Sequence, residues 1–316
     1  MPTDQTIAHD THLSASMIFG AIAVMFLLAL CYPLISVGLS ASPPMTFAAM
    51  RAAIAGLVLL MLAQYQNRPS ILGSRLWLGV VLIGVLATGI GFFGMFFGGA
   101  RVSPGLATVI SNSQPLIAAA LAWWVLDDRL TSVQRWGLLA GFCGVVLIGL
   151  PSASGSKSQL LGIAVILLGA VGIAIGNIIM SRIAVRIDII RATGWQLVIG
   201  SVPLAILAAY TEDATSVQWS FTFIAVLLML SLLGTAAPYV LWFALLQKAS
   251  LNKLNSFTFI TPILALLLGM MFFAETIPTL AFFGIGLSLT GVYWVNKARP
   301  VALLTQSVGP SETHAK

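Results

Sequence analysis

The sequence predicts an all-α polytopic membrane protein of ten transmembrane helices, arranged as two inverted five-helix repeats. Hydrophobic residues make up 59% of the 316-residue chain, charged residues only 8%, and the mean hydropathy is +1.02. A soluble domain carries about 25% charged residues, so this chain cannot cover its surface with water-compatible side chains. The other two observations are a series of long apolar runs and a pattern that recurs in both halves of the chain.

Ten apolar runs are long enough to cross a hydrocarbon core of roughly 30 Å, which takes about 20 helical residues. We place these spans at 16–38, 44–65, 76–98, 104–126, 133–150, 159–180, 190–210, 218–246, 251–273 and 279–296. They form a first repeat over 16–150 and a second over 159–297, flanked by polar tails at 1–15 and 298–316.

The distribution of Lys and Arg predicts the orientation of the chain, because cytoplasmic loops carry an excess of positive charge. With the N-terminus inside, twelve of the fifteen basic residues fall on the cytoplasmic side. Arg101 and Lys157 fall outside, and Arg51 lies within the second span. We therefore expect a multi-pass protein of the inner membrane with both termini in the cytoplasm.

A shift of 147 residues aligns the two halves of the chain without a gap from Thr88 and Thr235 onward. Identities are few, but a proline, an acid and two glycines recur at the same places in equivalent helices: Pro115 and Pro262, Asp128 and Glu275, Gly137 and Gly284, Gly144 and Gly291. Because five helices is an odd number, the second half enters the membrane upside down relative to the first. Inverted repeats are typical of secondary transporters, which bind substrate between the halves near the midplane.

These recurring residues resemble the signature of the EamA-type drug/metabolite transporter superfamily. The run "MRAAIAGLVLL" around Arg51 is similar to the second-helix motif of that family, whereas Asp128 stands where the family usually has Glu. The resemblance covers both halves and implies a ten-helix carrier, commonly an exporter of amino acids or other small metabolites.

Acidic and histidine side chains are missing from the middle of the predicted spans, and the three histidines lie in the tails. A metal centre needs clustered ligands, so we expect no metal and no cofactor, and we expect that the protein is not an enzyme. Without a deep carboxylate, a proton relay would have to use the acids at helix ends, so gradient-driven export or exchange is favoured. The basic residues are dispersed over loops, which argues against a nucleic-acid partner.

Arg51 is the one charged residue well inside a span, roughly 10 Å below the outer end at 1.5 Å per residue. An intramembrane charge is a functional hypothesis by default, and here it could attract a substrate carboxylate. The structural alternative, which we favour from sequence alone, is that Arg51 binds helix-end carbonyls or extends outward.

Polar and aromatic residues inside the spans are the other candidates for substrate contact, although each could equally join two helices. The predicted substrate-binding residues are Tyr32, Arg51, Phe92, Met95, Asn112, Gln114, Asn177, Trp195, Gln196, Tyr239, Trp242, Asn255 and Thr258. Helix breaking or gating is assigned to Pro115, Pro238 and Pro262, and a structural role at helix ends to Asp128 and Glu275. Cys31 and Cys143 are expected to pack as small apolar side chains between helices.

The sequence thus favours a carrier that exports amino acids or related small metabolites by alternating access around a central cavity. Its expected partners are the small-molecule substrate and the lipid bilayer. The glycine pairs Gly94/Gly98, Gly137/Gly141 and Gly172/Gly176 predict close helix packing and leave a homodimer open. Three alternatives also stay open: an exporter of amphipathic drugs or cations, a membrane enzyme acting on lipid-linked substrates, and an interaction protein without transport activity.

Overall fold

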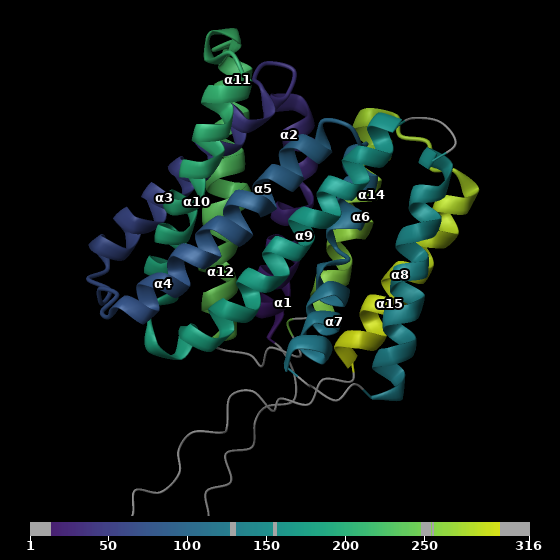
Figure 1. Ribbon diagram of the computed structural model, residues 1–316, viewed down its shortest axis with the longest axis horizontal. Coiled ribbons are helices and arrows are strands. Elements are labelled where there is room, and N and C mark those ends of the chain that lie inside the picture. The colour runs from purple at the N-terminus through teal and green to yellow at the C-terminus, as the bar shows by residue number, and fades with distance from the viewer. Residues whose placement is uncertain (1–13, 127–130, 154–156, 248–253, 255, 298–316) are drawn as a thin grey trace, which may run out of the picture.

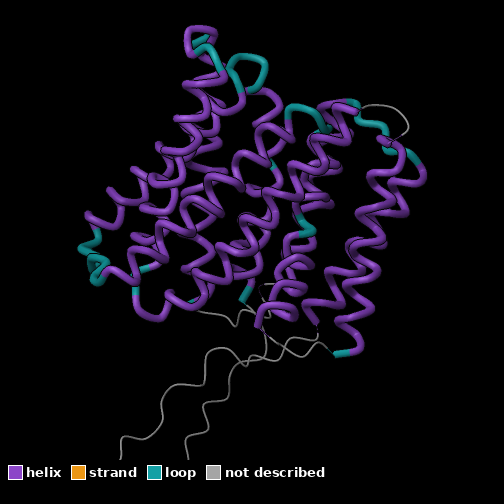
Figure 2. Tube along the Cα trace, viewed as in Figure 1, coloured by secondary structure: helices purple, strands orange, loops and turns teal. Residues whose placement is uncertain are grey.

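The computed structural model describes residues 14–126, 131–153, 157–247, 254 and 256–297. This part of the chain is a bundle of helices joined by short loops and contains no strand (Figures 1 and 2). The first residues of α1 and the last residues of α15 lie on the same side of the bundle (Figure 1).

The helices of the first half follow the predicted spans. They are α1 (Ala15–Ala29), α2 (Cys31–Gly38), α3 (Pro44–Tyr65), α4 (Ser74–Ile83), the π-helical η1 (Gly84–Ile90), α5 (Gly91–Phe93), the π-helical η2 (Gly94–Gly98), α6 (Pro104–Ser111), α7 (Gln114–Leu126) and α8 (Ser132–Ala153).

The second half begins with two unbroken long helices, and its later helices are interrupted. Its described elements are α9 (Lys157–Ile183), the 3₁₀ turn η3 (Ala184–Arg186), α10 (Ile189–Thr211), the 3₁₀ turn η4 (Ala214–Ser216), α11 (Phe221–Ser231), the π-helical η5 (Leu232–Ala236), α12 (Ala237–Leu246), the 3₁₀ turn η6 (Ser256–Phe259), α14 (Ile260–Phe273) and α15 (Thr279–Lys297).

Six helical stretches are long and apolar enough to cross a membrane. They are Ala15–Gly38, Pro44–Tyr65, Ser74–Gly98, Lys157–Arg186, Ile189–Thr211 and Phe221–Leu245. Three further apolar helices, Ser132–Ile148, Ile260–Phe273 and Thr279–Val295, are shorter. The chain is therefore a multi-pass membrane protein.

Prolines explain two interruptions that the predicted spans did not include. The first span breaks at Leu30 because Pro33 has no N–H to give to the carbonyl of Ala29. The span predicted at 104–126 is two helices, separated at Asn112 and Ser113 shortly before Pro115. The third and eighth spans instead bend through π-helical segments, which occur often at functional sites.

Helices α3 and α10 pack side by side and antiparallel, and side-chain contacts join the two helices at each end of the pair. At one end the carboxylate of Glu212 accepts hydrogen bonds from the backbone N–H groups of Met45 and Thr46, both at 2.8 Å. At the other end Arg68 forms a 2.8 Å ion pair with Asp188, which itself caps the start of α10. These caps satisfy N–H groups that a helix start leaves unpaired.

Helices α8 and α15 form a second antiparallel pair, at the opposite end of the bundle from α3 and α10 (Figure 1). Glycines allow the two backbones to touch. A Cβ atom on Gly137 would lie 2.9 Å from the carbonyl oxygen of Gly291, and one on Gly144 would lie 2.6 Å from that of Gly284. The predicted close packing at Gly137 is confirmed, whereas the prediction for Cys143 was wrong, because its side chain is exposed.

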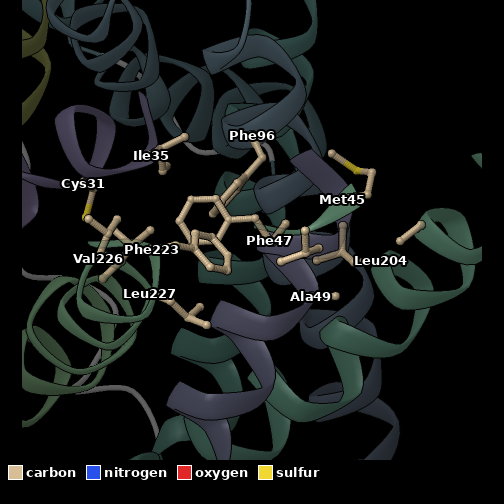
Figure 3. Packing of buried hydrophobic residues seen from close by; sticks show 14 residues of the cluster. Cys31, Ile35, Met45, Phe47, Ala49, Phe96, Leu204, Phe223, Val226 and Leu227 are labelled. Atoms are coloured by element: carbon tan, nitrogen blue, oxygen red, sulfur yellow. The ribbon is translucent and has the colours of Figure 1, made fainter. Parts of the chain in front are cut away.

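An aromatic cluster joins α3, η2 and α11 (Figure 3). The ring of Phe47 packs edge-on against Phe96 at 5.1 Å and against Phe223 at 5.4 Å between centroids. Cys31 belongs to the same cluster, so the apolar packing reaches the α2 residues that border Arg51. A surface cavity of about 490 Å³ lies at the α2–α3 connection, where Leu39 and Ala41 pack on the cluster.

Candidate functional site

Arg51 lies on α3 with only 3% of its surface exposed. No carboxylate among the described residues pairs with its guanidinium group. Removing a charge from water costs several kcal/mol unless polar partners compensate. The atoms around Arg51 therefore define what this part of the bundle can bind.

The π-helical turn of the eighth span supplies two of these partners. Arg51 donates from Nε to the hydroxyl of Thr235 at 2.9 Å and from Nη2 to the carbonyl of Gly234 at 3.3 Å. Pro238 cannot donate to the carbonyl of Gly234 four residues before it, and the thiol of Cys31 also donates to this oxygen, at 3.3 Å. The predicted helix breaker thus leaves a carbonyl that accepts from Arg51.

The remaining surroundings of Arg51 are polarisable and neutral. Nη1 lies 3.4 Å from the sulfur of Met95, and the guanidinium carbon lies 4.7 Å from the ring centre of Phe92 and 5.7 Å from that of Phe96. Cation–π contacts contribute about 2 kcal/mol or more when they are desolvated. The guanidinium is stabilised, but its positive charge is not neutralised.

Gln196 on α10 faces the same region from the other half of the chain. Its side chain is 6% exposed and donates to the hydroxyl of Thr88 at 3.3 Å. The hydroxyl of Tyr239 lies near the side chains of Gln196 and Arg51. The residue as a whole is 37% exposed, unlike the buried Arg51 and Gln196.

The break between α6 and α7 brings a second group of polar side chains close to this region. The hydroxyl groups of Tyr32 and Ser111 are 3.0 Å apart, and Asn112 donates to the carbonyl of Thr108 at 2.8 Å. Tyr32 directly follows Cys31, so the two groups are joined through α2. The hydroxyl of Ser113 is buried and has no hydrogen-bond partner among the described residues.

Several predicted site residues lie elsewhere. Trp195 packs edge-on against Trp77, 5.3 Å between ring centres, in a separate apolar cluster. Trp242 packs with Met17 and other residues of α1, and Asn177 on α9 is exposed.

Residues near the two recurring prolines are placed only in part. Gln114 and Pro115 are half-buried at the start of α7, and Pro262 is buried in α14. Thr258 is half-buried in η6. Asn255 and Asp128 lie outside the described residues.

Glu275, predicted as a structural acid, follows α14 and binds the start of α6. Its carboxylate accepts from the backbone N–H of Gly105 at 2.8 Å and from the hydroxyl of Ser103 at 3.0 Å. This contact fixes the end of one helix to the start of its neighbour and lies away from Arg51.

Sequence reasoning did not identify Thr88 or Thr235 as site residues, and it treated Cys31 only as packing. Small polar residues are common between membrane helices, so none of them is distinctive alone. The internal repeat could have pointed to the two threonines, because Thr88 and Thr235 occupy equivalent positions in the two halves and are the same residue type. In the described part of the chain, no group of three His, Cys, Asp or Glu residues is placed to hold a metal ion.

Comparison with known proteins identifies the architecture around this site. The sequence model of the EamA-like transporter family matches residues 15–150 and matches again over residues 160–297. The chain belongs to the EamA-like transporter family. Both copies of the EamA-like match contain residues of the site: Arg51 and Thr88 in the first, Gln196, Thr235 and Tyr239 in the second.

Several relatives of this EamA-like protein are named as transporters or efflux pumps. The uncharacterized transporter YvbV of Bacillus subtilis is 30% identical over 90% of this chain and 92% of its own length. The chloroplastic WAT1-related protein of Arabidopsis thaliana is 35% identical over 80% of this chain, which spans 63% of that protein. The probable amino-acid metabolite efflux pump of Salmonella typhimurium is 24% identical over 87% of this chain and 93% of that protein.

Proposed function

We propose that this EamA-like transporter exports amino acids or related small metabolites across the inner membrane by alternating access. In this proposal ten helices form two inverted repeats, both termini are cytoplasmic, and substrate binds between the repeats. The observation that carries the proposal is the pairing of equivalent residues from the two halves around Arg51 and Gln196.

The contact between α8 and α15 supports the inverted repeat. By the 147-residue shift, Gly137 is equivalent to Gly284, and Gly144 to Gly291. Gly137 touches Gly291 while Gly144 touches Gly284. A two-fold axis exchanges contacts in this way, since residue i meets j of the partner and j meets i.

Hydrogen bonds at the candidate site support the same axis. In the sequence, a shift of 145 residues aligns Arg51 with Gln196, and the 147-residue shift aligns Thr88 with Thr235. The bond from Arg51 to Thr235 then corresponds to the bond from Gln196 to Thr88. Polar groups of both halves thus meet at a repeat interface, which is where transporters of this architecture bind substrate.

Phe92 and Tyr239 are also equivalent by the 147-residue shift, and they lie beside the same two side chains, Arg51 and Gln196. The ring centre of Phe92 lies 4.7 Å from the guanidinium carbon of Arg51, and its equivalent Tyr239 lies near Gln196. Aromatic rings, a thioether and an amide beside one guanidinium suit a small molecule with a carboxylate and a moderately apolar body. An organic cation fits less well, because Arg51 is positive and no carboxylate among the described residues compensates it.

The proposed direction of transport and the proposed orientation of the chain in the membrane are supported by separate observations. The Salmonella relative is named as a probable efflux pump for amino-acid metabolites. The basic residues at the ends of α3 and α9 and at the start of α10, such as Arg68, Arg186 and Arg191, favour a cytoplasmic location for that side of the bundle.

Flux measurements in proteoliposomes test the proposal. Purified full-length protein should catalyse counterflow of at least one labelled amino acid or derived carboxylate, and protein-free vesicles should not. Arg51→Gln should lower that flux about tenfold or more, since hydrogen bonds to charged groups contribute about 1.5–3 kcal/mol. Arg75→Gln, at the exposed start of α4, serves as the control. Product formation from a lipid-linked substrate without any flux would reject transport in favour of an enzyme.

A further inference from the structure

We infer that Arg51 and Gln196 form one carboxylate-binding site across the repeat axis, and that the neutral side chain of Gln196 is what makes the site select monocarboxylates. This inference rests on the proposed transport function and names the chemical group that the site recognises.

The two positions have matching surroundings but different charge. Each side chain donates to an equivalent threonine of the opposite half, Arg51 to Thr235 and Gln196 to Thr88. Each lies against an equivalent aromatic residue, Arg51 against Phe92 and Gln196 against Tyr239. The site is therefore symmetric in shape and asymmetric in charge, with one positive group in total.

The unneutralised guanidinium determines which ligand group binds. The acceptors that surround Arg51 are a hydroxyl, a carbonyl and two sulfurs, all uncharged. Sulfur is a weak acceptor, so a carboxylate would form stronger, charge-assisted hydrogen bonds with the same N–H groups.

Tyr239 provides the second contact for this carboxylate. Its hydroxyl lies near both Arg51 and Gln196, and at 37% exposure it is the most accessible of these three residues to a ligand. A carboxylate placed there receives hydrogen bonds from Arg51 and from neutral donors. A second carboxylate would find no second positive charge among the described residues of the site.

The ammonium group of an amino acid has no matching partner here. No Asp or Glu among the described residues contacts Arg51, Tyr239 or Gln196. Recognition should consequently depend on the carboxylate and tolerate loss of the amino group.

Four probes with one apolar body test this dependence: L-phenylalanine, 3-phenylpropionate, L-phenylalanine amide and 2-phenylethylamine. In proteoliposomes containing wild-type protein, the two carboxylates should compete for transport about tenfold or more better than the amide and the amine. This comparison needs no variant. Equal competition by all four probes would overturn the carboxylate site.

Charge substitutions test the role of the two positions. Arg51→Gln should abolish the preference for carboxylates, and Gln196→Glu should do the same by placing a negative charge beside Arg51. Gln64→Glu adds the same charge at the exposed end of α3 and should leave the preference unchanged. Gel filtration and thermal unfolding in detergent verify that each variant is folded.

The exchange variant Arg51→Gln/Gln196→Arg is the most direct test. It moves the guanidinium to the equivalent place in the other half, where Thr88 can accept its hydrogen bond. Recovery of the carboxylate preference relative to Arg51→Gln is the expected result. A folded exchange variant that transports without this preference would overturn the shared site, whereas no flux of any probe by the wild type would overturn the proposed substrate class.

Discussion

At the scale of single residues, the position of Arg51 depends on groups that bend other helices. Pro238 and the π-helical turn before it present the carbonyl of Gly234 and the hydroxyl of Thr235 to the guanidinium. The structure therefore supports the structural alternative that the sequence left open. Arg51 binds a backbone carbonyl, as a structural arginine would. No carboxylate among the described residues neutralises its charge, and its contact with a substrate stays a prediction.

Thr235 is the residue whose loss should separate these roles. Thr235→Val keeps the side-chain shape but removes the acceptor for Arg51 Nε, which leaves a buried donor unpaired at a cost of about 1–3 kcal/mol. We expect lower thermal stability in detergent and several-fold weaker transport. Thr211→Val is the matched control, because the Thr211 hydroxyl bonds only within its own helix and is exposed. Equal losses in both variants would contradict the role of Thr235.

Sequence reasoning identified the large residues of this site and missed the small ones. Arg51, Gln196, Tyr239 and Phe92 stand out within apolar runs, and the structure brings them together. Trp195 was equally conspicuous but packs on Trp77. The difference depends on which face of a helix meets its neighbour, and nearly uniform apolar sequences do not specify that face.

At the scale of helices, the described helices fall within or close to the predicted spans, but their interruptions were only partly predictable. Proline positions account for the breaks after Ala29 and before Gln114. The π-helical segments η1, η2 and η5 have no comparable pattern in sequence, because they depend on how a neighbouring helix fills the widened turn. Glycine and proline in these stretches indicated flexibility but did not specify its form.

The crossing of α8 and α15 gives a prediction with a control on the same helix. A methyl group at Gly284 would lie 2.7 Å from the carbonyl oxygen of Gly144, whereas one at Gly286 would meet no atom within 4 Å. Gly284→Ala should lower stability by about 1–3 kcal/mol through overpacking. Gly286→Ala should be neutral or raise stability by up to about 1 kcal/mol, since Ala favours helix. Thermal unfolding in detergent compares the two, and similar shifts would refute the close crossing.

At the scale of the whole molecule, the repeat was visible in sequence, but its geometry was not. The recurrence of a proline, an acid and two glycines indicated two related halves. It did not indicate that equivalent helices would pack on one another, as α3 does on α10 and α8 on α15. Those contacts join residues far apart in the chain, and no local pattern encodes them.

The proposed orientation can be measured by labelling single cysteines in intact cells. In a Cys143→Ser background, Asp213→Cys should react with a membrane-impermeant maleimide, because the loop after α10 is expected outside. Arg186→Cys should react only after the cells are permeabilised. Cys31 can remain, since it is buried. The opposite labelling pattern would reverse the orientation, and labelling of both residues in sealed cells would contradict the span between them.

The capped pair of α3 and α10 has a consequence for the transport cycle. Glu212 fixes one end of the pair and the Arg68–Asp188 ion pair fixes the other, so these two helices cannot slide along each other without breaking contacts at both ends. Arg51 lies on α3 and Gln196 on α10, so both residues belong to this fixed pair of helices. If Arg51 and Gln196 bind the substrate as proposed, the spacing between them would stay constant while the surrounding helices tilt, so a substrate would meet the same arrangement of groups from either side of the membrane.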